Sequence, residues 1–343
     1  MTARATGVRT EPMISSAAAA GLAEAIEAAG RDPDDVLRAV GLDRASLADR
    51  HRFIPSAAFT RALEEAARVT GDDCFGLHFG ERYHPKDIGA LTYVVLNSPT
   101  IAAAFENIAR YLRIYNEAAT VSFVQGDKHA FLQHQLRDVP PQRRRQHEEY
   151  ALTVGLAVIR MMAGSEWRPL EVRFEHEAPP RTGEHARIFG APVLFRCDGN
   201  VMVIERDFCD RQVPTADRRL YPILEDYLER QLEKRPAENR FVVSVRTAIG
   251  HAMKEGEPKV TDVAAAIGLS VRTLQRRLNE SGVDYRALVD DIRQELGLRY
   301  LRDRRHTLSD VAYLLGYSEI SAFSRAFRRW TGATPSDYRR RNG

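Results

Sequence analysis

A short motif that occurs twice near the end of this 343-residue chain constrains its fold more than any other feature. The segment DVAAAIGLSVRTLQRRL begins at Asp262, and DVAYLLGYSEISAFSRAF begins at Asp310. In each copy an apolar helical pattern ends at a glycine, and a serine then precedes a second helical pattern. This order is typical of a helix-turn-helix, in which glycine ends the first helix and serine caps the second. We therefore predict such motifs over 261–282 and 309–332.

Each copy separates packing residues from outward-facing ones. Thr261 is expected to cap the first helix of the first copy, and Ser270 and Ser318 the second helix of each copy. Leu274 and Leu278 in the first copy, and Phe323 and Phe327 in the second, have the spacing that packs one helix onto another. The remaining surface carries Arg272, Thr273, Gln275, Arg276 and Arg277 in the first copy and Ile320, Ser321, Ser324, Arg325, Arg328 and Arg329 in the second.

Arginine and glutamine suit the reading of duplex DNA, because they form paired hydrogen bonds with guanine and adenine edges in the major groove. Arg328 and Arg329 come later in their helix and are expected nearer the phosphates. A solvated arginine face on an ordinary helical hairpin is the structural alternative for either copy alone. The segment between the copies, DYRALVDDIRQELGLRYLRD, predicts one helix of roughly 30 Å. Successive major grooves are about 34 Å apart, so one chain can offer two helices to neighbouring grooves.

Charge divides the chain in the same place. Residues 241–343 hold 18 Lys+Arg and 12 Asp+Glu, a net +6, whereas residues 1–240 hold 32 and 35, a net −3. A basic C-terminal domain favours a polyanionic partner. The three cysteines are unpatterned, and the longest apolar run, 150–159, is too short to span a bilayer. We expect a cytoplasmic protein that has no membrane segment.

The rest of the chain predicts an α+β regulatory domain over 14–205, followed by an all-α domain over 241–343. Within the first domain we expect three helices in 14–70, a loop and apolar turn over 75–100, and a helix over 101–114. A hairpin over 119–136, a helix over 142–164, a strand over 170–174, a helix over 183–189 and two short strands around Asp198-Gly199 follow. Residues 1–13 are expected to be disordered. Residues 206–240 predict a helical linker whose charged helix, 215–237, is a candidate for dimerisation.

The C-terminal segment also resembles a known family. The strings VTDVAAAIGLSVRTLQRRL, ELGLRYLRD and FSRAFRRWTGATPSDYRR look like the DNA-binding domain of the AraC/XylS transcription regulators. That resemblance implies base contacts by Arg272, Gln275 and Arg276, then by Ile320, Ser321, Ser324 and Arg325, with backbone contacts near Arg328 and Arg329. Ile320 stands where a polar residue is often found, which weakens the readout expected from the second helix. FGLHFGERYHPKDIGALTYVVLNSPT, EWRPLEVRFEHEAP and IFGAPVLF resemble the arabinose-binding type of AraC regulatory domain.

The resemblance implies a homodimeric regulator, often an activator, controlled by a small-molecule effector or a partner, with RNA polymerase as a further candidate partner. For the effector the sequence nominates Arg110, Arg113, Tyr115, Arg144 and His147, which would suit an anionic or aromatic ligand if they converged. Solvated helix faces are the alternative interpretation of this set. No cofactor and no metal site is expected. A non-specific nucleic-acid binder is the first functional alternative, and an enzyme in the N-terminal domain is the weaker second one.

Overall fold

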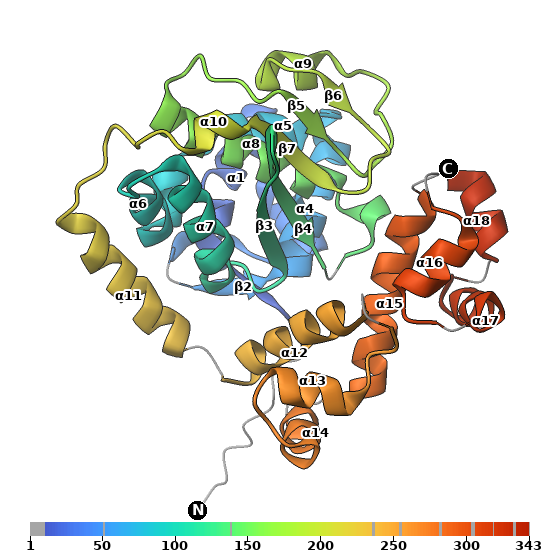
Figure 1. The fold of residues 1–343 in the computed structure, drawn as a ribbon. Helices are drawn as coiled ribbons and strands as arrows, with labels where there is room; N and C mark the ends of the chain where they lie inside the picture. Colours follow the sequence, from blue (N-terminus) through green and yellow to red (C-terminus); the bar gives the residue numbers. More distant parts are fainter. Residues whose placement is uncertain are drawn as a thin grey trace, which may run out of the picture. The chain divides into compact units, whose positions relative to one another are not determined.

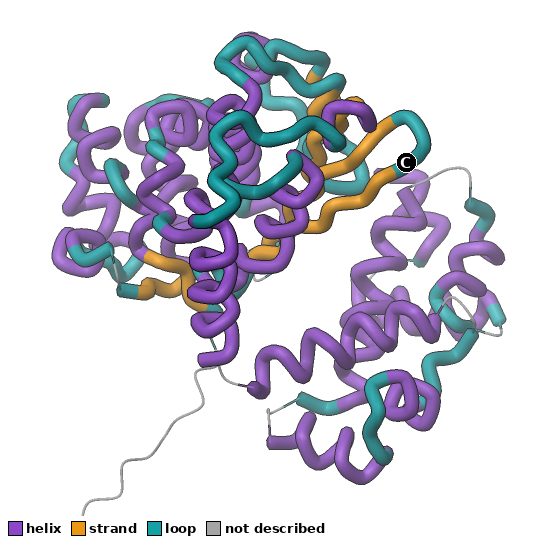
Figure 2. The backbone as a smooth tube through the Cα atoms, turned by 60° about the vertical axis from the view of Figure 1, so that its left-hand side comes forward, coloured by secondary structure: helices purple, strands orange, loops and turns teal. Residues whose placement is uncertain are grey.

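The computed structural model describes residues 11–50, 52–137, 139–234, 237–253, 256–280, 283–302, 306–317, 319–331 and 334–342. The chain divides into two compact units, Met1–Leu232 and Glu233–Gly343 (Figure 1). The described strands all lie in the first unit, and the described part of the second is helical (Figure 2). The predicted fold class, an α+β domain followed by an all-α domain, is confirmed.

The first unit begins with a small helical layer. Its elements are β1 (Met13–Ser15), α1 (Leu22–Ala28), α2 (Pro33–Ala39), α3 (Arg44–Ala48), β2 (Phe53–Pro55) and α4 (Ser56–Thr70). Four helices and two strands thus replace the three helices expected. Of the segment 1–13 that was expected to be disordered, residues 1–10 lie outside the described residues. Met13 corrects the rest of that expectation, because it pairs with Pro55 and its backbone N–H donates to Glu117 at 2.9 Å.

A five-stranded sheet forms the other half of this unit. Its strands are β3 (Ala119–Gln125), β4 (His129–Leu136), β5 (Glu171–Arg173), β6 (Val193–Leu194) and β7 (Asn200–Glu205), in the order β3-β4-β7-β5-β6. The hairpin of β3 and β4 is confirmed, with Ala119 opposite Leu136. Strand β6 runs parallel to β5, whereas the other neighbouring strands of this sheet are antiparallel.

The segment 75–100 is helical rather than loop. It contains α5 (Phe75–Arg82) and α6 (Ala90–Leu96), and α7 (Ile101–Tyr111) follows. Gly76 and Gly80, which look like helix breakers, lie where α5 crosses the long helix α8 (Arg145–Ala163). A Cβ atom on Gly76 would overlap the backbone carbonyl of Gln146. These glycines therefore allow two backbones to approach closely, and they do not end the helix.

Helix α8 connects the two halves of the first unit. Leu152, Leu156 and Ile159 pack in the sheet-side core, whereas Tyr150 and Val154 pack with the N-terminal helices. Because both faces meet apolar neighbours, the first turns of α8 are buried around their whole circumference, including Gln146, His147, Glu148 and Glu149. A helix in this position needs internal partners for its polar side chains.

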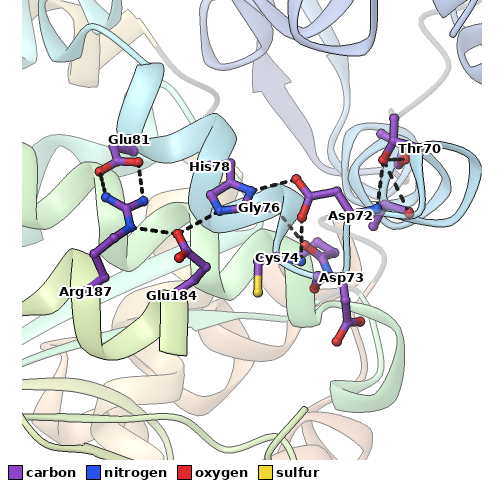
Figure 3. A network of polar contacts seen from close by, with 12 residues as sticks. Thr70, Asp72, Asp73, Cys74, Gly76, His78, Glu81, Glu184 and Arg187 are labelled. Carbon is purple, nitrogen blue, oxygen red and sulfur yellow. Dashed lines mark hydrogen bonds and ion pairs between the residues drawn. The ribbon is translucent and has the colours of Figure 1, made fainter. Parts of the chain in front are cut away.

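A polar network joins α5 to α9 (Gly183–Phe189) on the surface of the same unit (Figure 3). His78 contacts Asp72 through Nδ1 at 2.7 Å and Glu184 through Nε2 at 3.0 Å. Arg187 binds Glu184 at 2.7 Å and also donates to both carboxylate oxygens of Glu81. The network spans more than 100 residues of sequence with side chains from two helices and the loop before α5.

The predicted linker 206–240 forms α10 (Arg206–Cys209), α11 (Leu220–Lys234) and the start of α12 (Ala237–Met253). Leu228 and Leu232 of α11 are buried in the sheet-side core of the first unit. Tyr111 of α7 donates a hydrogen bond to Glu229, and Arg110 forms an ion pair with the same carboxylate at 2.8 Å. Helix α11 is therefore an integral part of the first unit along one of its faces.

The second unit consists of α12, α13 (Val260–Ala266), α14 (Val271–Glu280), α15 (Tyr285–Arg302), α16 (Leu308–Leu314), α17 (Ile320–Thr331) and α18 (Pro335–Asn342). It has two small cores. One includes Leu274 and Leu278 and is completed by α12, while the other includes Phe323 and Phe327. Leu296 of α15 contacts both cores, so this helix connects the two motifs as the sequence predicts.

Candidate DNA-binding surfaces and ligand cavity

The first helix-turn-helix consists of α13 and α14. Gly268 has φ 69°, the left-handed conformation expected where the first helix ends. Ser270 caps α14, because its hydroxyl accepts from the backbone N–H of Thr273 at 3.2 Å. Thr261 is not the cap of α13. The helix begins at Val260 with Lys259 in the capping position, and the Thr261 hydroxyl bonds to Asp262 instead.

The face of α14 opposite its core is accessible. Leu274 and Leu278 are buried, and the side chains of Arg272, Gln275 and Arg276 are exposed. Thr273 is half-buried and its hydroxyl contacts Ser270. Arg277 differs from its neighbours, because its guanidinium stacks over the ring of Phe241 in α12 at 4.3 Å. This contact turns Arg277 toward its own domain, while three other predicted base-reading residues face outward.

The second motif repeats the arrangement with α16 and α17. Gly316 has φ 71°, and Thr307 forms a capping box with Asp310 at the start of α16. Ser318, the predicted cap of α17, lies outside the described residues. The outward side of α17 carries the exposed side chains of Ile320, Ser321, Arg325, Arg328 and Arg329 and the half-buried Ser324. Arg329 forms an ion pair with Asp290 of α15 at 2.7 Å, and Ser321 donates to Glu319.

One arginine that the motif analysis did not single out holds the second turn. Arg293 of α15 donates to the carbonyl oxygens of Leu315 at 3.0 Å and Gly316 at 3.3 Å. Its guanidinium also stacks over Tyr317 at 4.3 Å. These carbonyls lie at the end of α16, where a helix has unpaired acceptors and a cation is favourable. Arg293 therefore fixes α16 to the connecting helix.

A cavity of about 140 Å³ lies inside the first unit. Its wall is formed by β1, α6, α7, β3, β4, α8 and β7, and includes Leu91, Val95, Ile108, Leu132, Val158 and Met202. Among the described residues, the lining has no Lys, Arg, Asp or Glu side chain. Polar atoms come from neutral side chains and from two histidines, so this site is suited to an uncharged ligand.

The five effector candidates do not converge on this cavity as a set. Tyr115 and His147 belong to its lining, whereas Arg110, Arg113 and Arg144 do not. Arg110 is paired with Glu229 on the surface. Arg144 is buried, where it forms an ion pair with Glu175 at 2.7 Å and donates to the carbonyl of Val139. The charge of Arg144 is therefore neutralised within the fold.

Most polar side chains at the start of α8 have internal partners, although Oε2 of Glu149 has no hydrogen-bond partner among the described residues. Glu148 accepts from His134 at 2.6 Å and from the backbone N–H of Leu136 at 3.2 Å. Burial raises the pKa of Glu148, but His134 and Arg144 outweigh it, so the net pKa is lowered and the carboxylate stays ionised. Glu149 contacts His185 at 3.0 Å in the same interior. These contacts account for residues that, in sequence, resemble a ligand-binding cluster.

Within the described ranges, none of the helices combines the length and apolar character needed to cross a bilayer.

Two family models match this chain, one in each of its two units. Residues 30–213, more than half of the chain, match the family described as the arabinose-binding domain of AraC transcription regulator, N-terminal, and residues 263–341 match a helix-turn-helix domain. The ornithine utilization regulator of Pseudomonas aeruginosa is 26% identical over 321 residues, covering 89% of this chain and 93% of that protein. The transcriptional regulator VirS of Mycobacterium tuberculosis is 27% identical, with 92% of each chain covered. A solved structure, the transcriptional regulator CdpR from Pseudomonas aeruginosa, is 23% identical, with a TM-score of 0.42 over 90% of this chain and 96% of that one.

Two helix-turn-helix motifs behind an α+β unit define a DNA-binding transcription regulator. The chain belongs to the AraC family of these regulators, in the subgroup with the arabinose-binding type of N-terminal domain.

Proposed function

We propose that this regulator reads a specific duplex DNA site through α14 and α17, and that a small molecule in the N-terminal cavity controls it. The observation that carries the DNA contact is the division of α14 into two faces. Arg272, Gln275 and Arg276 are exposed. Leu274 and Leu278, on the opposite face, hold the helix to its core. Side chains that can bond guanine and adenine edges are therefore presented on one accessible helical surface.

The same division supports the contacts proposed for α17. Phe323 and Phe327 are fully buried, and Ser321, Ser324 and Arg325 lie on the other side of the helix beside Ile320. Arg325 is the candidate for base contact, and Ile320 offers an apolar surface for a thymine methyl group. Arg328 and Arg329 lie further along α17 and are assigned to phosphates, which position a protein without specifying sequence.

Arg276 provides the test of base reading. Arg276→Ala is expected to cost ~1–3 kcal/mol on the cognate site and to relax the preference at one base pair. Arg277→Ala is the matched control, because Arg277 stacks on Phe241 and should contribute little to base preference. Binding is measured by footprinting and titration on the promoter nearest the gene, on randomised variants of that site, and with single-stranded competitor. Equal losses on cognate and random DNA would make Arg276 a phosphate contact, and competition by single strands would favour a non-specific binder.

Control by a ligand is proposed at the cavity. We assign only Tyr115 and His147 of the five sequence candidates to it, because Arg110 and Arg144 have partners elsewhere. The enzyme alternative has less support, since the relatives named above are transcription regulators.

A cytoplasmic homodimer that activates transcription, with RNA polymerase as partner, completes the proposal. Dimerisation is supported by a second apolar stripe on α11, formed by Leu220, Ile223 and Tyr227, whose side chains are exposed. Activation is supported by the resemblance to AraC/XylS regulators. A promoter fusion assayed with and without the regulator gene checks the sign of regulation, and higher expression without the gene would indicate a repressor.

A further inference from the structure

The chemistry of the cavity limits what can bind there. Its volume of about 140 Å³ is close to that of a protein cavity that holds a single benzene ring, about 150 Å³. Apolar side chains form most of the wall, and among the described residues no Lys, Arg, Asp or Glu lines it, although His134 of the lining contacts the buried carboxylate of Glu148. A ligand carboxylate or ammonium would therefore lose its hydration without gaining an ion pair with a Lys, Arg, Asp or Glu of the lining, which is unfavourable.

His147 offers a hydrogen-bond acceptor to this cavity. Its Nδ1 lies 2.7 Å from the hydroxyl of Thr60, and that hydroxyl lies 3.0 Å from the carbonyl oxygen of Ser56. The threonine hydroxyl has one proton, which the Ser56 carbonyl accepts, so Nδ1 must be the protonated nitrogen that donates to Thr60. Nε2 then carries a lone pair, and within the described part of the chain it has no hydrogen-bond partner.

The ring of His147 is oriented to use that lone pair. The side chain is only 2% exposed and belongs to the cavity lining, whereas Thr60 does not. The Nδ1 edge of the ring is occupied by Thr60, so the rest of the ring, which includes Nε2, is what His147 can offer to the cavity. Burial lowers the pKa of His147 to about 3, so the ring stays neutral at ordinary pH.

Asn116 offers a donor to the same cavity. Its Oδ1 accepts from the backbone N–H groups of Ala118 at 3.1 Å and Ala119 at 3.2 Å, which fixes the orientation of the amide. Nδ2 is left with two N–H groups and has no hydrogen-bond partner among the described residues, although the side chain is only 5% exposed. An unused donor and an unused acceptor on an otherwise apolar wall are the features of a ligand site.

We propose that the ligand of this site is a neutral, largely apolar molecule of about one ring that carries a hydroxyl group, as phenols do. The hydroxyl donates to Nε2 of His147 and accepts from Nδ2 of Asn116. A pentose fits this cavity less well, because it would bury several hydroxyls against a wall that is mostly apolar. The inference rests on the proposed function only in calling this molecule the effector.

The experiment compares four probes on the full chain without DNA, by calorimetry and by the shift in thermal unfolding midpoint. Phenol is expected to bind, and toluene to bind about three- to tenfold more weakly, because it lacks the hydroxyl. Benzoate and arabinose are expected to give no shift. A larger shift with benzoate or arabinose than with phenol would overturn the proposal.

Two variants test the site itself. His147→Phe keeps a ring but removes the acceptor, and Thr60 keeps its bond to Ser56. Phenol affinity should fall to that of toluene, whereas toluene affinity should be unchanged; undiminished phenol binding would contradict the role of Nε2. Ala151→Leu fills the cavity from α8 and should abolish binding of both. Ala163→Leu, at the exposed end of the same helix, is the control and should bind phenol normally.

The outcome also separates this inference from effector control. If phenol binds but leaves DNA affinity unchanged, the proposed class of cavity ligand is supported, and the proposal that the cavity controls DNA binding is rejected. If arabinose or benzoate changes DNA affinity and phenol does not bind, control stands and the ligand class proposed here is wrong.

Discussion

His78 joins two elements of the first unit through contacts with carboxylates. Both of its ring nitrogens contact carboxylates, Asp72 at 2.7 Å and Glu184 at 3.0 Å (Figure 3). An imidazole can donate from both nitrogens only when it is protonated. Burial lowers the pKa of His78, but the hydrogen bonds to Asp72 and Glu184 outweigh it, so the net pKa is raised. His78 is therefore a cation that holds α9 to α5.

We first predict that His78→Gln lowers the free energy of unfolding by an amount that depends on pH. Because the folded pKa is raised, the stabilisation is fully present below the unfolded value of about 6.5 and is lost as pH rises through the folded pKa. We expect the variant to be about 1 kcal/mol less stable than the natural protein at pH 6, and this difference to shrink as the pH rises above the unfolded pKa. Urea unfolding of both proteins across this pH range gives the difference between their free energies of unfolding. Contributions from other titrating groups are common to both proteins and cancel in that difference. A difference that grows with pH would contradict the assignment.

The effector candidates show at the same scale what a sequence can and cannot indicate. Tyr115 and His147 were nominated from sequence, and both line the cavity. Arg144 was nominated with them, but it pairs with Glu175, which lies 31 residues away along the chain. That pairing depends on how the chain after β5 meets the start of α8, and local pattern carries no information about it. The lone pair on His147 likewise depends on Thr60, a residue of another helix.

At the scale of elements, the two helix-turn-helix motifs were predictable because their signals are local. A glycine with positive φ and a capping serine act within a few residues of each other, as Gly268 and Ser270 do. Helix α5 was missed for the opposite reason. Gly76 and Gly80 break a helical pattern in sequence, and their purpose is contact with α8, some 70 residues later. The three-residue strands β1 and β2 are too short to show an alternating pattern.

The two motif glycines give a matched pair of substitutions. Gly268 and Gly316 have nearly the same φ, 69° and 71°, so alanine meets a similar backbone penalty of about 1–2 kcal/mol at either site. At Gly268 nothing lies within 4 Å of the added Cβ, whereas at Gly316 it would overlap the carbonyl of Gly256. We expect Gly316→Ala to be the more destabilising by about 1–3 kcal/mol, because the backbone at Gly256 must shift.

Trp330 allows this pair to be measured in the full chain. It packs against the core of the second motif, and the chain has only 2 tryptophans. In a Trp167→Phe background, the fluorescence of Trp330 follows urea unfolding of the DNA-binding unit alone. If the two alanine variants lose the same free energy of unfolding, the backbone at Gly256 moves away from the added Cβ without a measurable penalty.

At the scale of the whole molecule, the unexplained feature is the outer face of α11. Tyr221, Leu224, Leu228 and Leu232 form one apolar stripe toward the first unit. Leu220, Ile223 and Tyr227 form a second stripe, and Ile223 is 66% exposed. Apolar side chains at i, i+3 and i+7 on an exposed face are the pattern by which one helix packs against another. A second copy of this chain would cover this second stripe with its own, in a symmetric contact.

The last prediction follows from that symmetry. In an isologous dimer each substitution occurs twice, so Ile223→Asp with Tyr227→Asp would place four carboxylates in one interface, where burial of unpaired charge is costly. We expect the full chain to sediment as a dimer and the double variant to dissociate about a hundredfold more readily, with a matching loss of affinity for a two-site operator. Tyr93→Asp, at an exposed aromatic of α6, should leave the dimer intact. If the double variant sediments as the natural protein does, α11 is not the interface, and its outer stripe must serve a different partner.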